Sequence, residues 1–163
     1  MKLSKIKVHV RVTPTELELA NGLRSGVSGR LYVEVEETFF PAQDWGDYVV
    51  PVLAWWLESA SRLTLAEIDV KNIFMDGAYS FVLRRTQGAD DVRISFWDAK
   101  RPMLEERTIS YRRYLAALRG AAKVAIAELY ALGYSGTGEA AELETRLEHL
   151  LRLEADLKTR GLS

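Results

Sequence analysis

Three aspartates, Asp44, Asp47 and Asp76, are the residues best placed for acid–base chemistry in this sequence. Two carboxylates held in one cleft with different environments can act as general acid and general base in hydrolysis. An enzyme of this kind, or a small-ligand-binding protein with a pocket between sheet and helices, would use Asp47 and Asp76, with Tyr79 nearby. A purely structural role also explains these residues, because Asp44 or Asp47 can cap a following helix and Asp76-Gly77 is a strong turn signal. We favour the structural explanation and keep the catalytic one as an alternative.

Other catalytic and cofactor chemistry has no support in the sequence. The chain has no cysteine, which excludes disulfides, thiolate metal sites and a cysteine nucleophile. His9 and His149 are the only histidines, and neither is followed by a second ligand at metal-binding spacing, so we expect no metal site. The phosphate-binding patterns GxxxxGK[ST] and GxGxxG and the nucleophile pattern GxSxG are also missing. We therefore predict no cofactor and no enzymatic activity.

The charged residues are divided between an acidic and a basic segment. The acids from Glu34 to Glu58 are not interrupted by any lysine or arginine, whereas cations dominate from Lys100 to Lys123. The net charge of −1 argues against nucleic-acid binding, which needs a surplus of cations. Acids together with tryptophans suit a basic protein partner, since aromatic anchors supply binding energy and opposite charge speeds association. The candidate partner-binding residues are Glu34, Glu36, Asp44, Trp45, Asp47, Trp55 and Asp76.

Hydrophobic periodicity predicts the elements that must position these residues. Apolar and polar residues alternate over 6–12, through Leu17 and Leu19, and over 31–36, which predicts three strands. A helix is predicted over about 47–63, with Pro51 in its first turn and Trp56 on its core face. Strand patterns return several times between 66 and 110. Helical periodicity then runs from 110 to 132 and resumes after the turn sequence "SGTG".

This order of elements predicts an α+β fold with an antiparallel sheet of about six strands. One helix is inserted after the third strand, and two antiparallel C-terminal helices pack on the sheet. We expect a single domain over 1–163, mainly β with one helix over 1–109 and a helical pair over 110–160. The N-terminal segment lacks the apolar run of a signal peptide, and no segment is long and apolar enough to span a membrane. We therefore expect a cytoplasmic protein that does not bind membranes.

Two segments, "FFPAQDWGDYVVPVLAWW" and "FMDGAYSFVLR", resemble a family of small bacterial hypothetical proteins. The shared features are a proline, a Trp-x-Asp before a helix that carries a tryptophan, and a strand ending in an Asp-Gly turn followed by an aromatic residue. That family is similar in size and α+β plan to the immunity proteins of bacterial polymorphic toxin systems. The resemblance covers roughly residues 30–97. It implies a fold more firmly than a role.

The resemblance and the acidic segment together lead to the expected function. We predict an immunity-type inhibitor that binds a cognate toxin, or another basic protein, and blocks the toxin's active site with acidic groups and a buried aromatic anchor. The alternative is a structural, self-associating module without catalytic activity. In that alternative Tyr32, Trp55 and Trp97 would be buried in a homodimer interface.

Overall fold

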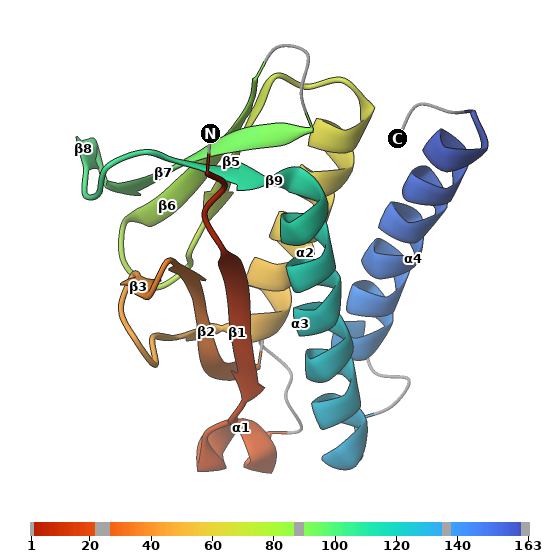
Figure 1. Ribbon diagram of the computed structural model, residues 1–163. Helices are drawn as coiled ribbons and strands as arrows, with labels where there is room; N and C mark the ends of the chain where they lie inside the picture. Colours follow the sequence, from red (N-terminus) through yellow and green to blue (C-terminus); the bar gives the residue numbers. More distant parts are fainter. Residues whose placement is uncertain (1, 22–26, 87–89, 135–137, 161–163) are drawn as a thin grey trace.

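The protein is an α+β fold in which β-strands lie on one side and three long helices on the other (Figure 1). The structure, a computed structural model, describes residues 2–21, 27–86, 90–134 and 138–160. The predicted fold class is confirmed, but the strands divide into an antiparallel sheet of four and another of five instead of one sheet of about six. None of the helices among the described residues has the length and apolar character that crossing a membrane requires.

The first sheet is built around its second strand, which pairs with the other three. Its members are β1 (Ile6–Val12), β2 (Ser28–Val35), β3 (Thr38–Phe40) and β4 (Gly46–Tyr48). In β1, Ile6 and Val12 are buried while Lys7 and Arg11 are exposed, which confirms the predicted alternation. The close approach of β1 to β2 requires Gly29, because a Cβ there would lie 2.1 Å from the Arg11 carbonyl oxygen.

The predicted strand through Leu17 and Leu19 is wrong, because this segment forms a short helix, α1 (Glu16–Ala20). Thr15 is its N-cap residue. The Thr15 hydroxyl accepts a hydrogen bond from the Glu18 N–H at 3.1 Å, and the Glu18 carboxylate accepts one from the Thr15 N–H. This capping box satisfies two N–H groups that a helix start leaves free, which the two leucines alone do not indicate.

The second sheet contains the strands predicted between 66 and 110. Its members are β5 (Asp69–Ile73), β6 (Tyr79–Arg85), β7 (Asp91–Asp98), β8 (Arg101–Pro102) and β9 (Arg107–Ser110). The predicted Asp76-Gly77 turn joins β5 to β6, and Gly77 has a positive φ of 78°. A parallel bridge between Ser4 and Ile109 links the N-terminal segment to β9, so the two sheets meet along this edge.

The first long helix, α2 (Val49–Leu65), follows the fourth strand and not the third. Tyr48 is its N-cap residue and makes no capping hydrogen bond with its side chain. The prediction that Asp44 or Asp47 caps this helix is therefore wrong. Pro51 does lie in the first turn, where its missing N–H breaks no helical hydrogen bond.

Aromatic rings join α2 to both sheets in one core. Trp56 is fully buried, as predicted, and its Nε1 donates to the Ile73 carbonyl oxygen at 2.9 Å. Its ring packs in T-shaped contacts with Phe74 and Phe81 at centroid distances of 5.1 and 5.0 Å. Buried residues of the strands and long helices belong to the same hydrophobic cluster, so the predicted β and helical parts share a core.

The two C-terminal helices, α3 (Tyr111–Ala131) and α4 (Gly138–Thr159), run antiparallel as predicted (Figure 1). The Ser110 side chain caps α3, and Gly133 follows its end with a positive φ of 84°. The predicted turn at 135–138 lies outside the described residues except for Gly138.

Only α3 of this pair packs on the strands, so the prediction that both helices cover the sheet is wrong for α4. α4 packs against α2 and α3 and forms an outer layer. Ion pairs tie it to both helices, Arg146 with Glu58 on α2 at 2.9 Å and Glu154 with Arg119 on α3. A leucine stripe indicates a buried face, but it does not show whether a sheet or a helix covers that face.

Candidate functional site

A groove of about 670 Å³ lies where α1, β4 and the turn between β5 and β6 meet. We call it the acidic groove, since its lining includes four carboxylates and one cation, namely Glu18, Asp44, Asp47, Asp76 and Arg30. Two exposed apolar side chains share this lining, Leu17 at 71% and Tyr48 at 41% exposure. Acids from three separate chain segments and exposed apolar surface therefore occur together at one place.

Asp47 lies beneath this groove and is only 5% exposed. Its Oδ1 accepts the Tyr48 N–H at 2.7 Å, and both carboxylate oxygens lie 3.2–3.3 Å from the backbone nitrogens of Met75 and Asp76. The Trp45 Nε1 donates to Oδ2 at 3.3 Å. Burial raises the pKa of Asp47, while these hydrogen bonds oppose the rise. Asp47 therefore fastens the turn after β5 to the start of α2 and positions the groove.

Asp44 and Asp76 carry the accessible carboxylates of the groove. The Asp44 side chain is 56% exposed, lies 3.6 Å from Arg30 Nη1 and accepts a hydrogen bond from the Tyr32 hydroxyl at 3.5 Å. The Asp76 side chain is exposed and has no hydrogen bond or ion pair within the described residues. The Asp76 carboxylate is therefore available to a cation from outside the molecule, and the exposed part of the Asp44 carboxylate can contact one beside its pair with Arg30.

Two residues of the catalytic alternative, Asp47 and Asp76, line the acidic groove, whereas Tyr79 is not part of its lining. Tyr79 packs its ring edge-on against Trp45 at a centroid distance of 5.1 Å. Within the described residues, no hydrogen bond joins the side chains of Asp47, Asp76 and Tyr79. Likewise, no group of three or more histidine, aspartate or glutamate side chains in the described part of the chain is arranged to hold a metal ion.

Glu34 and Glu36 lie outside the acidic groove. The Glu34 Oε2 lies 2.6 Å from His9 Nε2, and the His9 ring stacks on Tyr32 at a centroid distance of 4.6 Å. The hydrogen bond from His9 is the main reason that the pKa of Glu34 is lowered. Glu36 accepts the Lys5 backbone N–H at 2.7 Å. These two acids therefore hold β1 and β2 together at the first sheet's polar side.

The aromatic candidates are largely covered by the chain itself. Trp55 is partly buried and packs against the hydrophobic core, as does Trp45. Trp97 is partly buried and donates from Nε1 to Ser95 Oγ at 3.0 Å. Tyr32 is buried. The homodimer that would use these residues stays a prediction.

The predicted partner-binding set is thus brought together only in part. Asp44, Asp47 and Asp76 line the same groove, and Trp45 supports it through Asp47. The predicted site residues do not include Leu17 and Glu18, because the spacing of Leu17 and Leu19 indicates a strand. The spacing Thr15-x-x-Glu18 is a local capping signal that would have identified the helix that places them.

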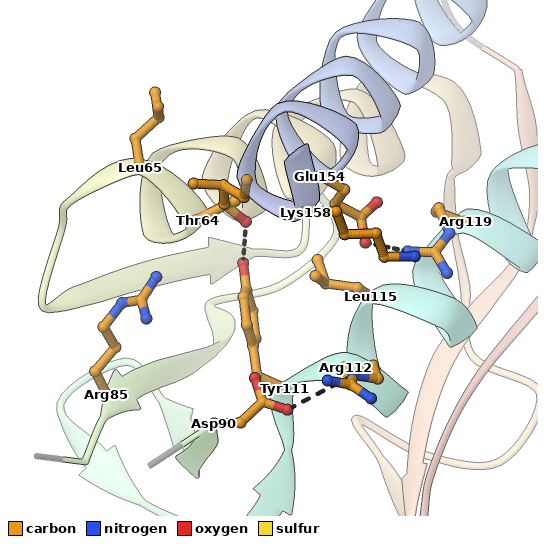
Figure 2. A pocket seen from close by; sticks show the side chains of 11 residues that line it. Thr64, Leu65, Arg85, Asp90, Tyr111, Arg112, Leu115, Arg119, Glu154 and Lys158 are labelled. Carbon is orange, nitrogen blue, oxygen red and sulfur yellow. Dashed lines mark hydrogen bonds and ion pairs between the residues drawn. The ribbon is translucent and has the colours of Figure 1, made fainter. Parts of the chain in front are cut away.

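A second pocket, of about 740 Å³, lies at the opposite end of α2 (Figure 2). The end of β6, the start of α3 and the last turns of α4 complete it. We call it the basic pocket, since four cations and two acids line it, namely Arg85, Arg112, Arg119, Lys158, Asp90 and Glu154. The predicted basic segment contributes only Arg112 and Arg119, and the other two cations come from distant parts of the sequence.

Tyr111 forms a fixed wall of the basic pocket (Figure 2). Its hydroxyl lies 2.8 Å from Thr64 Oγ1 and donates to the Ala60 carbonyl oxygen at 2.8 Å. The Arg85 guanidinium lies 5.7 Å from the centroid of its ring. Burial raises the pKa of Tyr111 to about 12, so the phenol stays neutral at physiological pH.

Comparison of the chain with protein-family models, with curated proteins and with solved structures gives no match. Function is therefore inferred from the two sites themselves.

Proposed function

We propose that this protein is a protein-binding module whose acidic groove receives a basic segment of a partner. The supporting observation is the convergence of Glu18, Asp44 and Asp76 beside exposed Leu17 and Tyr48. Opposite charge steers a cationic partner to such a groove, and exposed apolar side chains supply contact area that loses water on binding. An immunity-type inhibitor that occludes the active site of a cognate toxin is the narrower form of this proposal.

The residues of the acidic groove contribute to binding in different ways. Asp44 and Asp76 offer carboxylates at the surface, while Asp47 keeps the turn of Asp76 against the start of α2. A partner's lysine or arginine would pair with the exposed carboxylates, and its apolar side chains would cover Leu17 and Tyr48. The buried Asp47 contributes by holding the shape of the groove.

A short fluorescein-labelled peptide of alternating lysine and leucine tests the basic-partner proposal by fluorescence anisotropy. We expect binding that weakens as NaCl is raised from about 50 to about 300 mM, because exposed charges are screened. The double variant Asp44→Asn/Asp76→Asn should weaken binding about tenfold, which corresponds to about 1.4 kcal/mol. Leu17→Ala should weaken it several-fold, whereas Glu142→Gln on the exposed face of α4 is the matched control.

Two results would contradict the proposal. One is equal binding of a glutamate–leucine peptide, which would show that charge does not matter. The other is an unchanged affinity in the double variant. The narrower inhibitor role has a separate readout, which is rescue of growth when the protein is co-expressed with the reading frame beside its gene. Failure of rescue with intact peptide binding would reject only the inhibitor role.

A further inference from the structure

The basic pocket is separate from the acidic groove and opposite to it in charge. The groove includes Tyr48, immediately before α2, whereas the pocket includes Thr64 and Leu65, the last residues of that helix. Its volume of about 740 Å³ falls within the range of pockets that bury a small organic molecule. The partner proposed above has no role for it.

The cations of the basic pocket are only partly neutralised by the protein. Arg119 pairs closely with Glu154, and Arg112 Nε lies 4.0 Å from Asp90 Oδ2 in an exposed pair. Arg85 donates to the neutral Leu63 carbonyl oxygen and has no acid partner in the described part of the chain. Lys158 has no acid partner there either. About two positive charges of the lining are therefore left for a ligand.

Apolar surface lies between these cations. Leu115 is 6% exposed and lies between the cationic side chains in Figure 2, with the Tyr111 ring beside it. Leu157 and the exposed Leu65 complete the apolar part of the lining. The Tyr111 ring cannot swing away without losing both hydrogen bonds of its hydroxyl. This wall is formed before any ligand arrives, which reduces the entropic cost of binding.

We propose that the basic pocket binds a small organic anion with an apolar body. Its carboxylate or phosphate pairs with Lys158, which lies on the same side of the Tyr111 ring as Leu115 in Figure 2. Its apolar part packs on Leu115, Leu157 and the ring of Tyr111. Arg85 lies on the other side of that ring and attracts the anion through its charge, without direct contact. A lysine ammonium pairs with either anionic group as a compact point charge. A purely inorganic anion would leave the apolar walls uncovered, and a neutral apolar molecule would leave the two cations unpaired.

Titration with 8-anilinonaphthalene-1-sulfonate, an aromatic sulfonate that fluoresces when shielded from water, tests the pocket in the whole protein. Octanoate and octyl phosphate should both displace the probe. The one that displaces it at the lower concentration shows whether the pocket prefers a carboxylate or a phosphate. Octylammonium and inorganic phosphate should not displace it at the same concentration. Displacement by octylammonium as strong as that by octanoate would overturn the proposal.

Substitutions of pocket residues test whether octanoate binds in the basic pocket. Lys158→Gln, in the exposed last turn of α4, should weaken octanoate binding several-fold, and Arg85→Gln/Lys158→Gln should weaken it about tenfold or more. Lys123→Gln, an exposed cation of α3 outside the pocket, should leave the affinity unchanged. If the double variant fails to fold by circular dichroism, the single Lys158→Gln variant decides, and an unchanged affinity would overturn the proposal.

Changes in amide chemical shifts show where the ligand binds, independently of the variants. Octanoate should shift the signals of Leu65, Leu115 and Leu157 and leave those of Gly46 and Asp76 in the acidic groove in place. Shifts confined to the acidic groove, or no saturable shifts at all, would overturn the proposal. Binding only to vesicles of phosphatidylglycerol, with no shifts from free octanoate or octyl phosphate, would also overturn it.

Discussion

Replacing Asp47 with Asn tests whether this buried carboxylate holds the turn after β5 against the start of α2. The substitution keeps the side chain's size but exchanges one acceptor oxygen for an NH₂ group. Either oxygen faces the N–H groups of Met75 and Asp76. In addition, Oδ1 accepts from the Tyr48 N–H and Oδ2 accepts from the Trp45 indole N–H. In Asp47→Asn at least one of these donors therefore meets another donor.

The expected cost follows from these contacts. A buried donor left without its acceptor costs about 1–3 kcal/mol, and hydrogen bonds to charged groups are worth about 1.5–3 kcal/mol. Removing the charge offsets part of this loss, because burial opposes ionisation and raises the pKa of Asp47. We expect a net loss of about 2–3 kcal/mol in the free energy of unfolding. For a chain of this size the melting temperature should fall by about 4–12 °C.

Urea unfolding followed by circular dichroism at pH 7 measures this loss. Asp76→Asn is the matched control, since it removes an exposed negative charge from the same groove and should cost less than about 0.5 kcal/mol. The amide protons of Met75 and Asp76 should also exchange faster in Asp47→Asn, because they lose their acceptor. An Asp47→Asn variant as stable as the wild type, or no less stable than Asp76→Asn, would refute the positioning role.

Three further predictions, which use five substitutions, test the fold. Because the hydrogen bond from His9 lowers the pKa of Glu34, this acid stabilises the fold above its ordinary pKa of 4.5 and loses that contribution as the pH falls through the lowered value. The deficit of Glu34→Gln, about 1 kcal/mol at pH 7, should therefore disappear in urea titrations in strong acid. Gly29→Ala would place a Cβ 2.1 Å from a carbonyl oxygen and should cost about 3 kcal/mol or more by thermal unfolding. At Gly120 in α3, an added Cβ would meet no atom within 4 Å apart from its chain neighbours and the helix's own backbone, so Gly120→Ala should instead stabilise by about 0.5–1 kcal/mol. Trp56→Phe should cost about 2–3 kcal/mol in urea, and Trp55→Phe clearly less, because only Trp56 is fully buried.

Local patterns in the sequence were enough to predict most of the elements. The alternation in β1, the core position of Trp56 and the left-handed Gly133 after α3 depend on neighbouring residues, and each is confirmed. The error at α1 is also local. Leu17 and Leu19 suggested a strand, whereas the capping pair of Thr15 and Glu18 favours a helix.

The remaining features depend on contacts between distant segments, which a single sequence does not reveal. Asp47 was predicted to cap α2 because it lies just before it, but its acceptor oxygens are occupied by N–H groups 28 and 29 residues further along. The outer position of α4 could not be predicted either, since a leucine stripe packs equally well on a helix or a sheet. The acidic groove was predicted in part, because acids near Trp45 stood out by composition.

The two candidate sites share α2 as their support, and this arrangement makes their functions separable. α2 has 17 residues, so its ends are about 25 Å apart at 1.5 Å per residue. Exposed charges at that separation are screened in physiological salt, where the Debye length is about 8 Å. Most of α2 is buried between the sheets and α4, which leaves it little freedom to move as a lever. A basic partner in the groove and an organic anion in the pocket would therefore bind independently, so failure of either proposal leaves the other standing.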